Sequence, residues 1–507
     1  EANRWISKTE SRSRYDGCSV KKQPYLTDFP RTIIANSRRR LQAGIRRLRE
    51  SLRGESLSGY AVMFADVLPS AFLRDIDPTR RNRHFGCLPV FWAWLSQILE
   101  GNASCSKAVA LMQGWCRSAR LPIPSADTSS YCKGRGRLDE GFLDQIDARI
   151  ATHLGGRVRD EDLWNGMVLK AIDGSSMKLA DTMANQLEFP QPSVQKPGCG
   201  FPVMSVAGLL NLSHGGWEAM ATGPGNEHDL TMARRMLDHL QEGDLLLGDR
   251  AYCTYSLFAA VRDRGAHALM RLHQAREKTL DWRMGRKISR HERIVTWKRP
   301  YYCSVRRSMT REQWEAMPET MEVRLIRLHF EDRTGRRRRM TVATTLTDAA
   351  RFDGIQLHAL YARRWEIELR LRDIKTTLGF ELINTRTPEM ARKTLTMIRI
   401  AYNLMRVLMQ RAAHEAGQPV GAMSFKETID LATSIHESFR SLANKPRKRA
   451  AHARFLVEML AMRVVAPRPG RREPRALKQR PKPFPLLNAP RHEFVEIPHR
   501  SNYRASA

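Results

Sequence analysis

Two short apolar runs that each end in an aspartate, followed by a helix that carries a glutamate, constrain this chain most. Residues 167–173 read MVLKAID and end at Asp173, and residues 244–249 read DLLLGD and end at Asp249. Glu368 lies in residues 361–375, YARRWEIELRLRDIK, where apolar residues recur at helical spacing. Two aspartates at strand ends and one helical glutamate can converge on a pair of divalent ions. Such a pair would stabilise the attacking and the leaving oxygen when a phosphodiester bond is cut. The sequence therefore predicts an α/β fold with a carboxylate site at one edge of its sheet.

The glutamate helix also carries a row of other polar side chains. At about 100° per residue, Tyr361, Arg364, Glu368 and Lys375 fall within roughly 60° of one another. A neighbouring apolar stripe should pack on the sheet while the polar row stays exposed; the stripe consists of Leu360, Ile367, Leu371, Ile374 and Leu378. A carboxylate between two cations suits a site that holds a metal and phosphates. The alternative is a surface helix with ion pairs between residues four apart, such as Glu366 and Arg370.

The spacing Tyr-x2-Arg-x3-Glu-x6-Lys, filled by Tyr361, Arg364, Glu368 and Lys375, resembles the signature of DDE transposases of the insertion-sequence-four family. The sequences DGS from Asp173 and GDRAY around Asp249 are similar to the first and second aspartate motifs of that family, in the same order. The resemblance covers roughly residues 80–465. It implies a ribonuclease-H-like catalytic core with a β-rich insertion before the glutamate, preceded by a helical N-terminal DNA-binding domain. It also implies cut-and-paste transposition, which in some members passes through hairpin-ended DNA.

This resemblance assigns a role to each residue of the motif. Two Mg²⁺ ions, for which Mn²⁺ could substitute, would be held by Asp173, Asp249 and Glu368 as the catalytic residues. Arg364 and Lys375 would grip phosphates near the cut bond, with a hydroxyl contact from Tyr361. Trp365 would either stack on an extruded base or lie buried. Arg250 would either contact DNA or pair with an acid.

The same resemblance implies particular partners. These are double-stranded DNA, as terminal inverted repeats and as target, and a second copy of the chain, as a homodimer on DNA. With 85 Lys and Arg against 53 acids, the net charge is +32 and the pI is near 10.5, which favours a nucleic-acid partner. Ribosomal and membrane-surface proteins are the alternatives, although they rarely combine such length with 42% hydrophobic residues.

Cysteine usage and hydropathy indicate the compartment. The eight cysteines are scattered without a C-x-x-C pair, so we expect reduced thiols rather than a zinc site. No apolar run approaches the ~20 residues that span a bilayer, and no signal-peptide core is present. We therefore expect a cytoplasmic protein with no membrane partner. The resemblance implies that it is bacterial and nucleoid-associated when bound to DNA.

Six segments are expected along the chain. Residues 1–37 form a disordered or non-native start, because the chain begins with Glu and lacks periodicity there. Residues 38–155 form a helical DNA-binding region, 160–272 plus 339–410 the catalytic core, and 273–338 the β-rich insertion. Residues 411–465 form a C-terminal helical region, and 466–507 a basic, proline-rich tail.

The helical N-terminal region should contain helices at 38–53, 88–99 and 105–115, the last capped by Ser106. A third element projects Lys133, Arg135 and Arg137, which is compatible with a helix-turn-helix-like unit. An ordinary helical subdomain with a charged face is the alternative.

In the core we expect strands at 167–173, 244–249 and 266–272, and a hairpin of 202–212 with 217–222. Helices should occupy 228–240 and 255–264. A long helix should run from Pro388 to Gly417, capped by Thr387.

Two rival functions remain open from the sequence. A catalytically inactive, transposase-derived DNA-binding protein would share the composition, but it need not keep the triad. A metal nuclease without strand transfer would use the same carboxylates, because the joining step needs the same metals.

Overall fold

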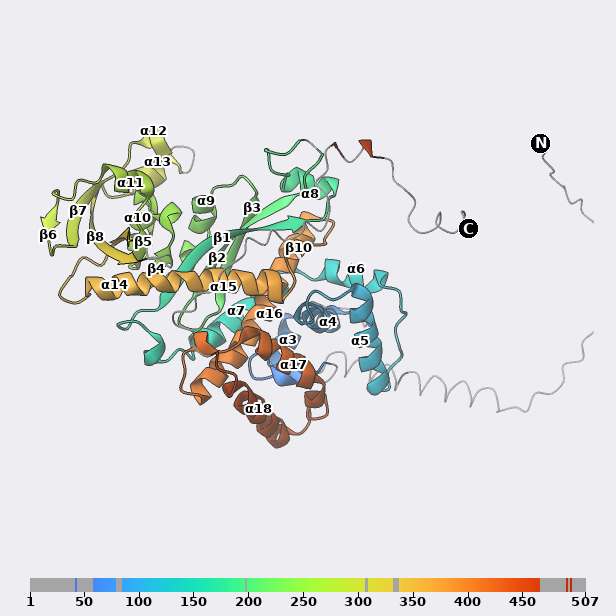
Figure 1. Cartoon of the computed structure of the whole chain (residues 1–507). Helices are drawn as coiled ribbons and strands as arrows, with labels where there is room; N and C mark the ends of the chain where they lie inside the picture. The colour runs from blue at the N-terminus through green and yellow to red at the C-terminus, as the bar shows by residue number, and fades with distance from the viewer. Residues whose placement is uncertain are drawn as a thin grey trace, which may run out of the picture. The chain divides into compact units, whose positions relative to one another are not determined.

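One large sheet forms the centre of the structure, a computed structural model (Figure 1). The structure describes residues 58–78, 84–196, 198–305, 309–331 and 337–465, together with 42, 489, 490, 493 and 494. Within these ranges ten strands belong to the sheet: β1 (Leu169–Leu179), β2 (Val203–Asn211), β3 (Trp217–Pro224), β4 (Leu245–Gly248), β5 (His267–Arg271), β6 (Arg286–Lys287), β7 (Glu292–Lys298), β8 (Thr320–Glu331), β9 (Arg337–Thr344) and β10 (Leu382–Ile383). Their order is β3-β2-β1-β4-β5-β9-β8-β7-β6, and β10 pairs with β1.

The first five strands have the ribonuclease-H-like arrangement. β3, β2 and β1 form an antiparallel meander, and β4 and β5 then add to β1 in parallel. Parallel neighbours need a crossover, and helix α10 (Tyr255–Asp263) supplies it between β4 and β5. The predicted α/β fold class is therefore confirmed, as is the hairpin that joins β2 to β3.

The insertion extends this sheet. β9 pairs with β5, and β8, β7 and β6 follow outward as antiparallel neighbours. Short helices interrupt the strands: α11 (Gln274–Thr279), α12 (Tyr302–Val305) and α13 (Arg311–Glu315). The predicted β-rich segment before Glu368 is thus continuous with the catalytic sheet, so its far edge is tied to the site by strand register.

Helices cover both faces of the sheet. α9 (Asp229–Arg234) and α10 close one face, where Ile172, Leu246 and Phe258 belong to one buried cluster. α14 (Gly354–Tyr361), α15 (Trp365–Arg372) and α16 (Pro388–Glu415) lie on the other, with α15 against β1 and α16 against β3 (Figure 1). Burial on both sides explains why β4 and the first residues of β1 are almost all apolar.

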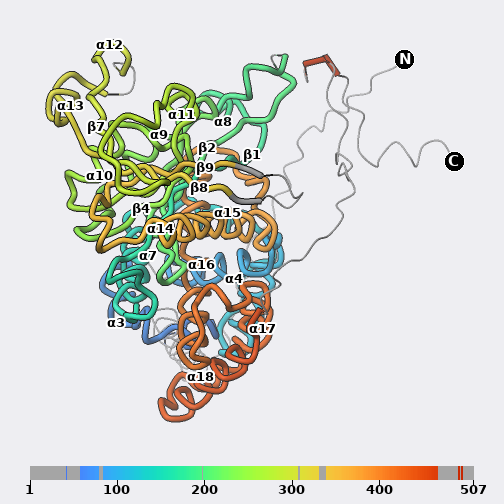
Figure 2. Tube along the Cα trace, turned by 60° about the vertical axis from the view of Figure 1, so that its left-hand side comes forward, coloured from blue at the N-terminus to red at the C-terminus, as the bar shows by residue number. Residues whose placement is uncertain are grey.

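The N-terminal and C-terminal helices pack together as one layer. They are α2 (Gly59–Met63), α3 (Ser70–Ile76), α4 (Cys87–Leu99), α5 (Cys105–Ser118), α6 (Ser129–Arg137), α7 (Glu140–Gly155), α17 (Phe425–Arg440) and α18 (Pro446–Ala461). The Trp115 indole N–H donates to Glu437 at 2.9 Å, and Arg399 pairs with Asp147 at 2.8 Å. α2 and α17 touch so closely that a Cβ on Gly59 would overlap the backbone of His436. Segments more than 300 positions apart in the sequence therefore share a core (Figure 2).

The structure corrects three local expectations. β1 does not end at Asp173 but continues to Leu179, because β2 pairs with it as far as Lys178. The helix predicted over 228–240 ends at Arg234 and resumes only as a 3₁₀ turn at Leu237–His239. The cap of α5 is Ser104, not Ser106, since its hydroxyl accepts from the Lys107 N–H at 3.2 Å.

Other element predictions are confirmed. The Thr387 hydroxyl caps α16 by accepting from the Met390 N–H. Residues 1–37, the 38–53 helix apart from Gln42, and most of the 466–507 tail lie outside the described residues. The chain divides into two units, Glu1–Glu50 and Ser51–Ala507, and every element above belongs to the second. None of the described helices is both long and apolar enough to cross a bilayer.

Candidate active site

Asp173 and Asp249 reach the same region of the sheet from adjacent strands. Ile172 on β1 is paired with Gly248 on β4, so the two aspartates directly follow a matched pair. Asp173 Oδ1 accepts from the Gly174 N–H at 2.9 Å, and Asp249 Oδ1 accepts from the Arg250 N–H at 2.6 Å. Asp249 follows its strand and caps a 3₁₀ turn, as a strand-end aspartate would.

The glutamate lies on a helical segment that changes pitch twice. A 3₁₀ turn, Ala362–Arg364, joins α14 to α15, and a π turn, Asp373–Thr377, follows α15. The apolar stripe predicted from Leu360 to Leu378 is buried throughout, which fixes the helix on the sheet. Such π turns occur frequently at functional sites. Here the π turn carries Lys375, and the 3₁₀ turn carries Arg364.

Arg364 connects the glutamate to the first aspartate. Its Nη2 lies 2.9 Å from Glu368 Oε1, and its Nη1 lies 3.5 Å from Asp173 Oδ2. Arg364 is only 7% exposed, which contradicts the expectation of an exposed polar row, and Tyr361 is buried as well. Tyr361 and Arg364 lie at the two ends of the 3₁₀ turn that joins α14 to α15. The guanidinium thus holds two carboxylates that would otherwise repel each other.

Asp173 interacts electrostatically with both of the other carboxylates. Burial raises the pKa of the Asp173 carboxyl, Arg364 opposes that rise, and the charges of Glu368 and Asp249 add to it. Burial also raises the pKa of Tyr361 to about 12, and the nearby Asp249 contributes to that increase. Asp249 therefore acts electrostatically on both Asp173 and Tyr361.

The donor set fits a hard divalent cation, because the three side chains offer only carboxylate oxygens. Among the described residues, no three His, Cys, Asp or Glu side chains lie close enough together to hold a metal ion. Arg364 contacts both Asp173 and Glu368. The positive charge that these carboxylates require is supplied by that side chain.

The remaining predicted site residues differ in their exposure. Lys375 is half-buried, and burial lowers the pKa of its ammonium group, with Glu381 opposing. Trp365 is 61% exposed, so the interpretation of a buried tryptophan is wrong, and its ring lies 5.1 Å from the Arg364 guanidinium carbon. Arg250 is exposed beside Asp249.

The basic residues of α6 do not all project. Lys133 and Arg137 are exposed, but Arg135 is partly buried, with its guanidinium 4.4 Å from the Trp94 ring centre. Its Nη1 also lies 3.6 Å from Cys105 Sγ. Arg135 therefore packs α6 against α4 and α5, which corrects its expected place on the projecting face.

Two side chains near the site were not singled out as its members from the sequence. The buried Tyr252 hydroxyl has no partner among the described residues, and burial raises its pKa, followed by the charges of Asp229, Asp173 and Asp249. The Asp229 carboxylate lies against Gly174 from the opposite face, where a Cβ would meet it at 3.0 Å. The only sequence signal was position: Tyr252 follows Asp249 by three residues, and Asp229 was one of several nearby acids.

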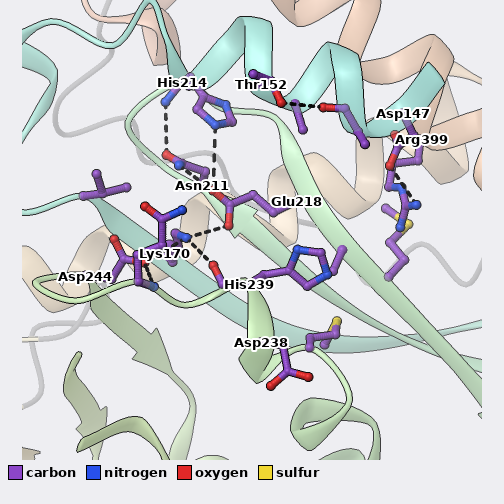
Figure 3. Close-up of a pocket in the computed structure, with 18 of the residues that line it drawn as sticks. Asp147, Thr152, Lys170, Asn211, His214, Glu218, Asp238, His239, Asp244 and Arg399 are labelled. Atoms are coloured by element: carbon purple, nitrogen blue, oxygen red, sulfur yellow. Dashed lines mark hydrogen bonds and ion pairs between the residues drawn. The ribbon is translucent and has the colours of Figure 1, made fainter. Parts of the chain in front are cut away.

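A separate cavity of about 1000 Å³ opens near the amino ends of β1 and β4 (Figure 3). Buried Lys170 donates to the His239 carbonyl at 2.7 Å and pairs with Glu218 and Asp244 at 2.7 and 2.8 Å. These charges satisfy one another, and none of the predicted site residues lines the cavity. The ion-pair network around Lys170 stabilises the starts of β1 and β4, which lie away from Asp173 and Asp249.

Known proteins are similar to this chain over the region that contains the candidate site. A family model described as a transposase DDE domain matches residues 164–404, a span that contains all three carboxylates. The transposase InsG for insertion sequence element IS4 of Escherichia coli (strain K12) is 26% identical over 365 residues, covering 71% of this chain and 79% of that protein. Both matches support a DDE transposase of the IS4 type.

A solved structure of a piggyBac transposase synaptic complex with hairpin DNA is also similar. It has a TM-score of 0.41 and 8% sequence identity, over 82% of this chain and 84% of that one. The similarity to DDE transposases is supported by the family model, by the IS4 relative and by the order of the strands in the sheet.

Proposed function

We propose that this DDE transposase excises a DNA element and inserts it elsewhere, with Asp173, Asp249 and Glu368 as its metal-binding catalytic residues. The observation that carries the proposal is the shared Arg364 contact, which brings a helical glutamate to the aspartate of β1. A pair of bound Mg²⁺ ions, or Mn²⁺ in their place, would supply Lewis-acid stabilisation of the attacking and leaving oxygens.

The chain's own residues have distinct parts in this proposal. Arg364 pairs with Asp173 and Glu368 in the free protein, and its guanidinium would bind a DNA phosphate if these carboxylates held metal ions. Tyr361, buried beside Arg364, limits where that guanidinium can point. Lys375 contributes a second cation from the π turn, on the same helical segment.

The exposed residues around the carboxylates would orient the DNA. Trp365 offers an open aromatic face next to Glu368, which suits stacking on a base that has left the duplex. Arg250 follows Asp249 directly and is placed to contact a phosphate. Lys133 and Arg137 of α6 present exposed charge for binding outside the catalytic core.

The test is excision from a plasmid that carries the coding sequence with its natural flanking DNA. Purified full-length protein with Mg²⁺ should release a linear fragment, and the fragment should join target DNA with a short duplication at each side. Cuts without joined products would favour a metal nuclease. DNA binding without any cut would favour an inactive, transposase-derived binding protein.

A further inference from the structure

We propose that the hairpin formed by β6 and β7 is a phosphate-binding element for double-stranded DNA, acting through Arg283, Arg286, Lys287 and Arg290. This inference rests on the proposed function, because it concerns the DNA on which the carboxylates act. It adds a binding surface at the far edge of the insertion, separate from the tyrosine, arginine and lysine of the glutamate helix.

The four cations are open to solvent and little neutralised. All four are exposed, and the Arg283 side chain reaches 95% exposure, with Asp281 4.0 Å away. Arg286, Lys287 and Arg290 have no ion-pair partner among the residues that the structure describes. The next acid in sequence, Glu292, accepts instead from the buried Arg324, at 2.8 Å from its Nε. The hairpin tip therefore keeps a net positive charge.

The tip is held rigidly rather than as a loose loop. Arg293 donates to the Trp282 carbonyl at 3.0 Å and to the Ser289 carbonyl at 2.9 Å, which closes the turn. The Arg327 guanidinium lies 4.0 Å from the centre of the Trp282 ring. Gly285 has φ +82°, and a Cβ there would lie 2.4 Å from the Ile294 carbonyl oxygen, so the tight turn requires glycine. Cations on a preorganised scaffold lose less entropy when they bind.

Strand register places this tip on the line of the active site. The row of paired residues that starts at Gly248, next to Asp249, crosses the sheet and ends at Lys287; its members in order are Gly248, Met270, Ala343, Leu325, Arg293 and Lys287. A duplex that runs along the edge of the sheet, parallel to this row, would meet the carboxylates at one end and the hairpin at the other.

The spacing suits a contact on the same DNA molecule. Five strand intervals of about 4.8 Å give at most roughly 24 Å between Gly248 and Lys287. Phosphates recur about every 3.4 Å along one strand of a duplex. The hairpin would thus bind phosphates up to about seven nucleotides from the bond that is cut.

Edge protection is the competing explanation. β6 is the outermost strand of the sheet, and proteins often keep edge strands short and rich in Lys to prevent pairing between molecules. Protection of the edge strand β6 requires only charged side chains on that strand. It does not require that these cations change the affinity of the protein for DNA, so the two explanations can be separated.

The experiment measures how DNA affinity depends on salt, using the full-length protein and a 40-base-pair duplex of mixed sequence. The triple variant Arg286→Gln, Lys287→Gln, Arg290→Gln is compared with wild type. Its matched control is Lys445→Gln, Arg447→Gln, Lys448→Gln, which removes three exposed charges at the start of α18. The slope of log Kobs against log salt should become shallower by about 0.9 for each lost phosphate contact, and the control slope should match wild type.

Each outcome decides between the explanations. Equal slopes for the hairpin variant and wild type would overturn the inference, and self-association of that variant in size-exclusion chromatography would then establish edge protection. Equal losses in the hairpin variant and its control would also overturn it, since binding would follow net charge alone. If the triple variant fails to fold, Lys287→Glu alone should still weaken binding at low salt. Wild-type protein that does not bind DNA would overturn the proposed function itself.

Discussion

At the scale of single residues, Arg364 is the side chain on which the account depends most. It is buried, and it contacts carboxylates that come from a strand and from its own helix. A cation in that position competes with any metal for the same oxygens. If these carboxylates bind metal as proposed, the arginine would both stabilise the free site and oppose metal binding.

Replacing Arg364 by Met should strengthen Mn²⁺ binding by the DNA-free protein while it impairs DNA cleavage. A unit charge at 4 Å contributes about 4 kcal/mol at an effective dielectric constant of 20. Solvent screening reduces that figure because the Glu368 side chain is 38% exposed. If one third of this interaction energy remains, removing the guanidinium should change the affinity for Mn²⁺ about tenfold.

Titration calorimetry with Mn²⁺ checks this directly. Arg363→Met is the matched control, because Arg363 pairs with Glu366, at 2.8 Å, and contacts no triad residue in the described structure. Unchanged Mn²⁺ affinity in Arg364→Met would show that the guanidinium does not compete with the metal.

Trp365→Ala should leave stability nearly unchanged but weaken binding to DNA that has an unpaired base at its end. The ring is largely exposed, and exposed substitutions usually change the free energy of unfolding by about 0.5 kcal/mol or less. Stacking on one base contributes about 1–3 kcal/mol, which corresponds to at least a fivefold loss. Fluorescence anisotropy with unpaired and fully paired ends measures it, with Tyr301→Ala as the exposed aromatic control. An equal loss on both DNAs would argue against stacking.

At the scale of elements, the sequence predicted what is local and repeated. The stripe from Leu360 to Leu378 and the strand that leads to Asp249 follow from periodicity and length, and both are confirmed. The continuation of β1 past Asp173 could not be predicted, because it depends on pairing with β2, about 30 residues away. The burial of Arg364 depends likewise on a 3₁₀ turn and on contact with Asp173, neither of which leaves a periodic signal.

The turn between β2 and β3 should make the protein sensitive to acid through His214. Its Nδ1 accepts from the Gly216 N–H at 3.0 Å, so protonation there would break the turn. Burial lowers the pKa of His214 to about 3, and Lys170 and Arg406 add to the shift. The pKa of His214 is lower in the folded protein than in the unfolded protein, where it is about 6.5. Neutral His214 therefore stabilises the folded state fully above pH 6.5, and this stabilisation is lost as the pH falls toward 3.

Between pH 7 and 5 this single group should cost about 2 kcal/mol of unfolding free energy. Urea unfolding of wild type and His214→Asn at the two pH values measures the difference. The variant starts less stable because it loses the turn contact, but its stability should depend less on pH. Identical pH dependence in both proteins would mean that another group controls the acid response.

At the scale of the whole molecule, the transposase combines a rigid sheet with a helical layer from both ends of the sequence. α7 contacts the long helix α16, and α2 contacts α17, so the N-terminal helices pack against helices from the second half of the sequence. The net charge of +32 favours electrostatic binding to DNA. The assignment of residues 38–155 as a DNA-binding region stays a prediction.

We predict that two copies assemble when two DNA ends are present. One set of carboxylates provides one active site, and excision needs cutting at both ends of an element. Light scattering should give a mass of two chains with paired element ends, whatever the state of the free protein. Full cleavage by a complex of one chain and one DNA end would contradict this assembly.

The central claim is that Asp173, Asp249 and Glu368 act as one metal-dependent catalytic unit. The most direct measurement is Mg²⁺-dependent cleavage of the natural element ends by Asp173→Asn, Asp249→Asn and Glu368→Gln, alongside DNA affinity for each variant. The account predicts that every one of the three loses cleavage while its affinity for DNA stays within a few-fold of wild type. Wild-type cleavage rates in any one of these variants would remove that residue from the site and contradict the triad.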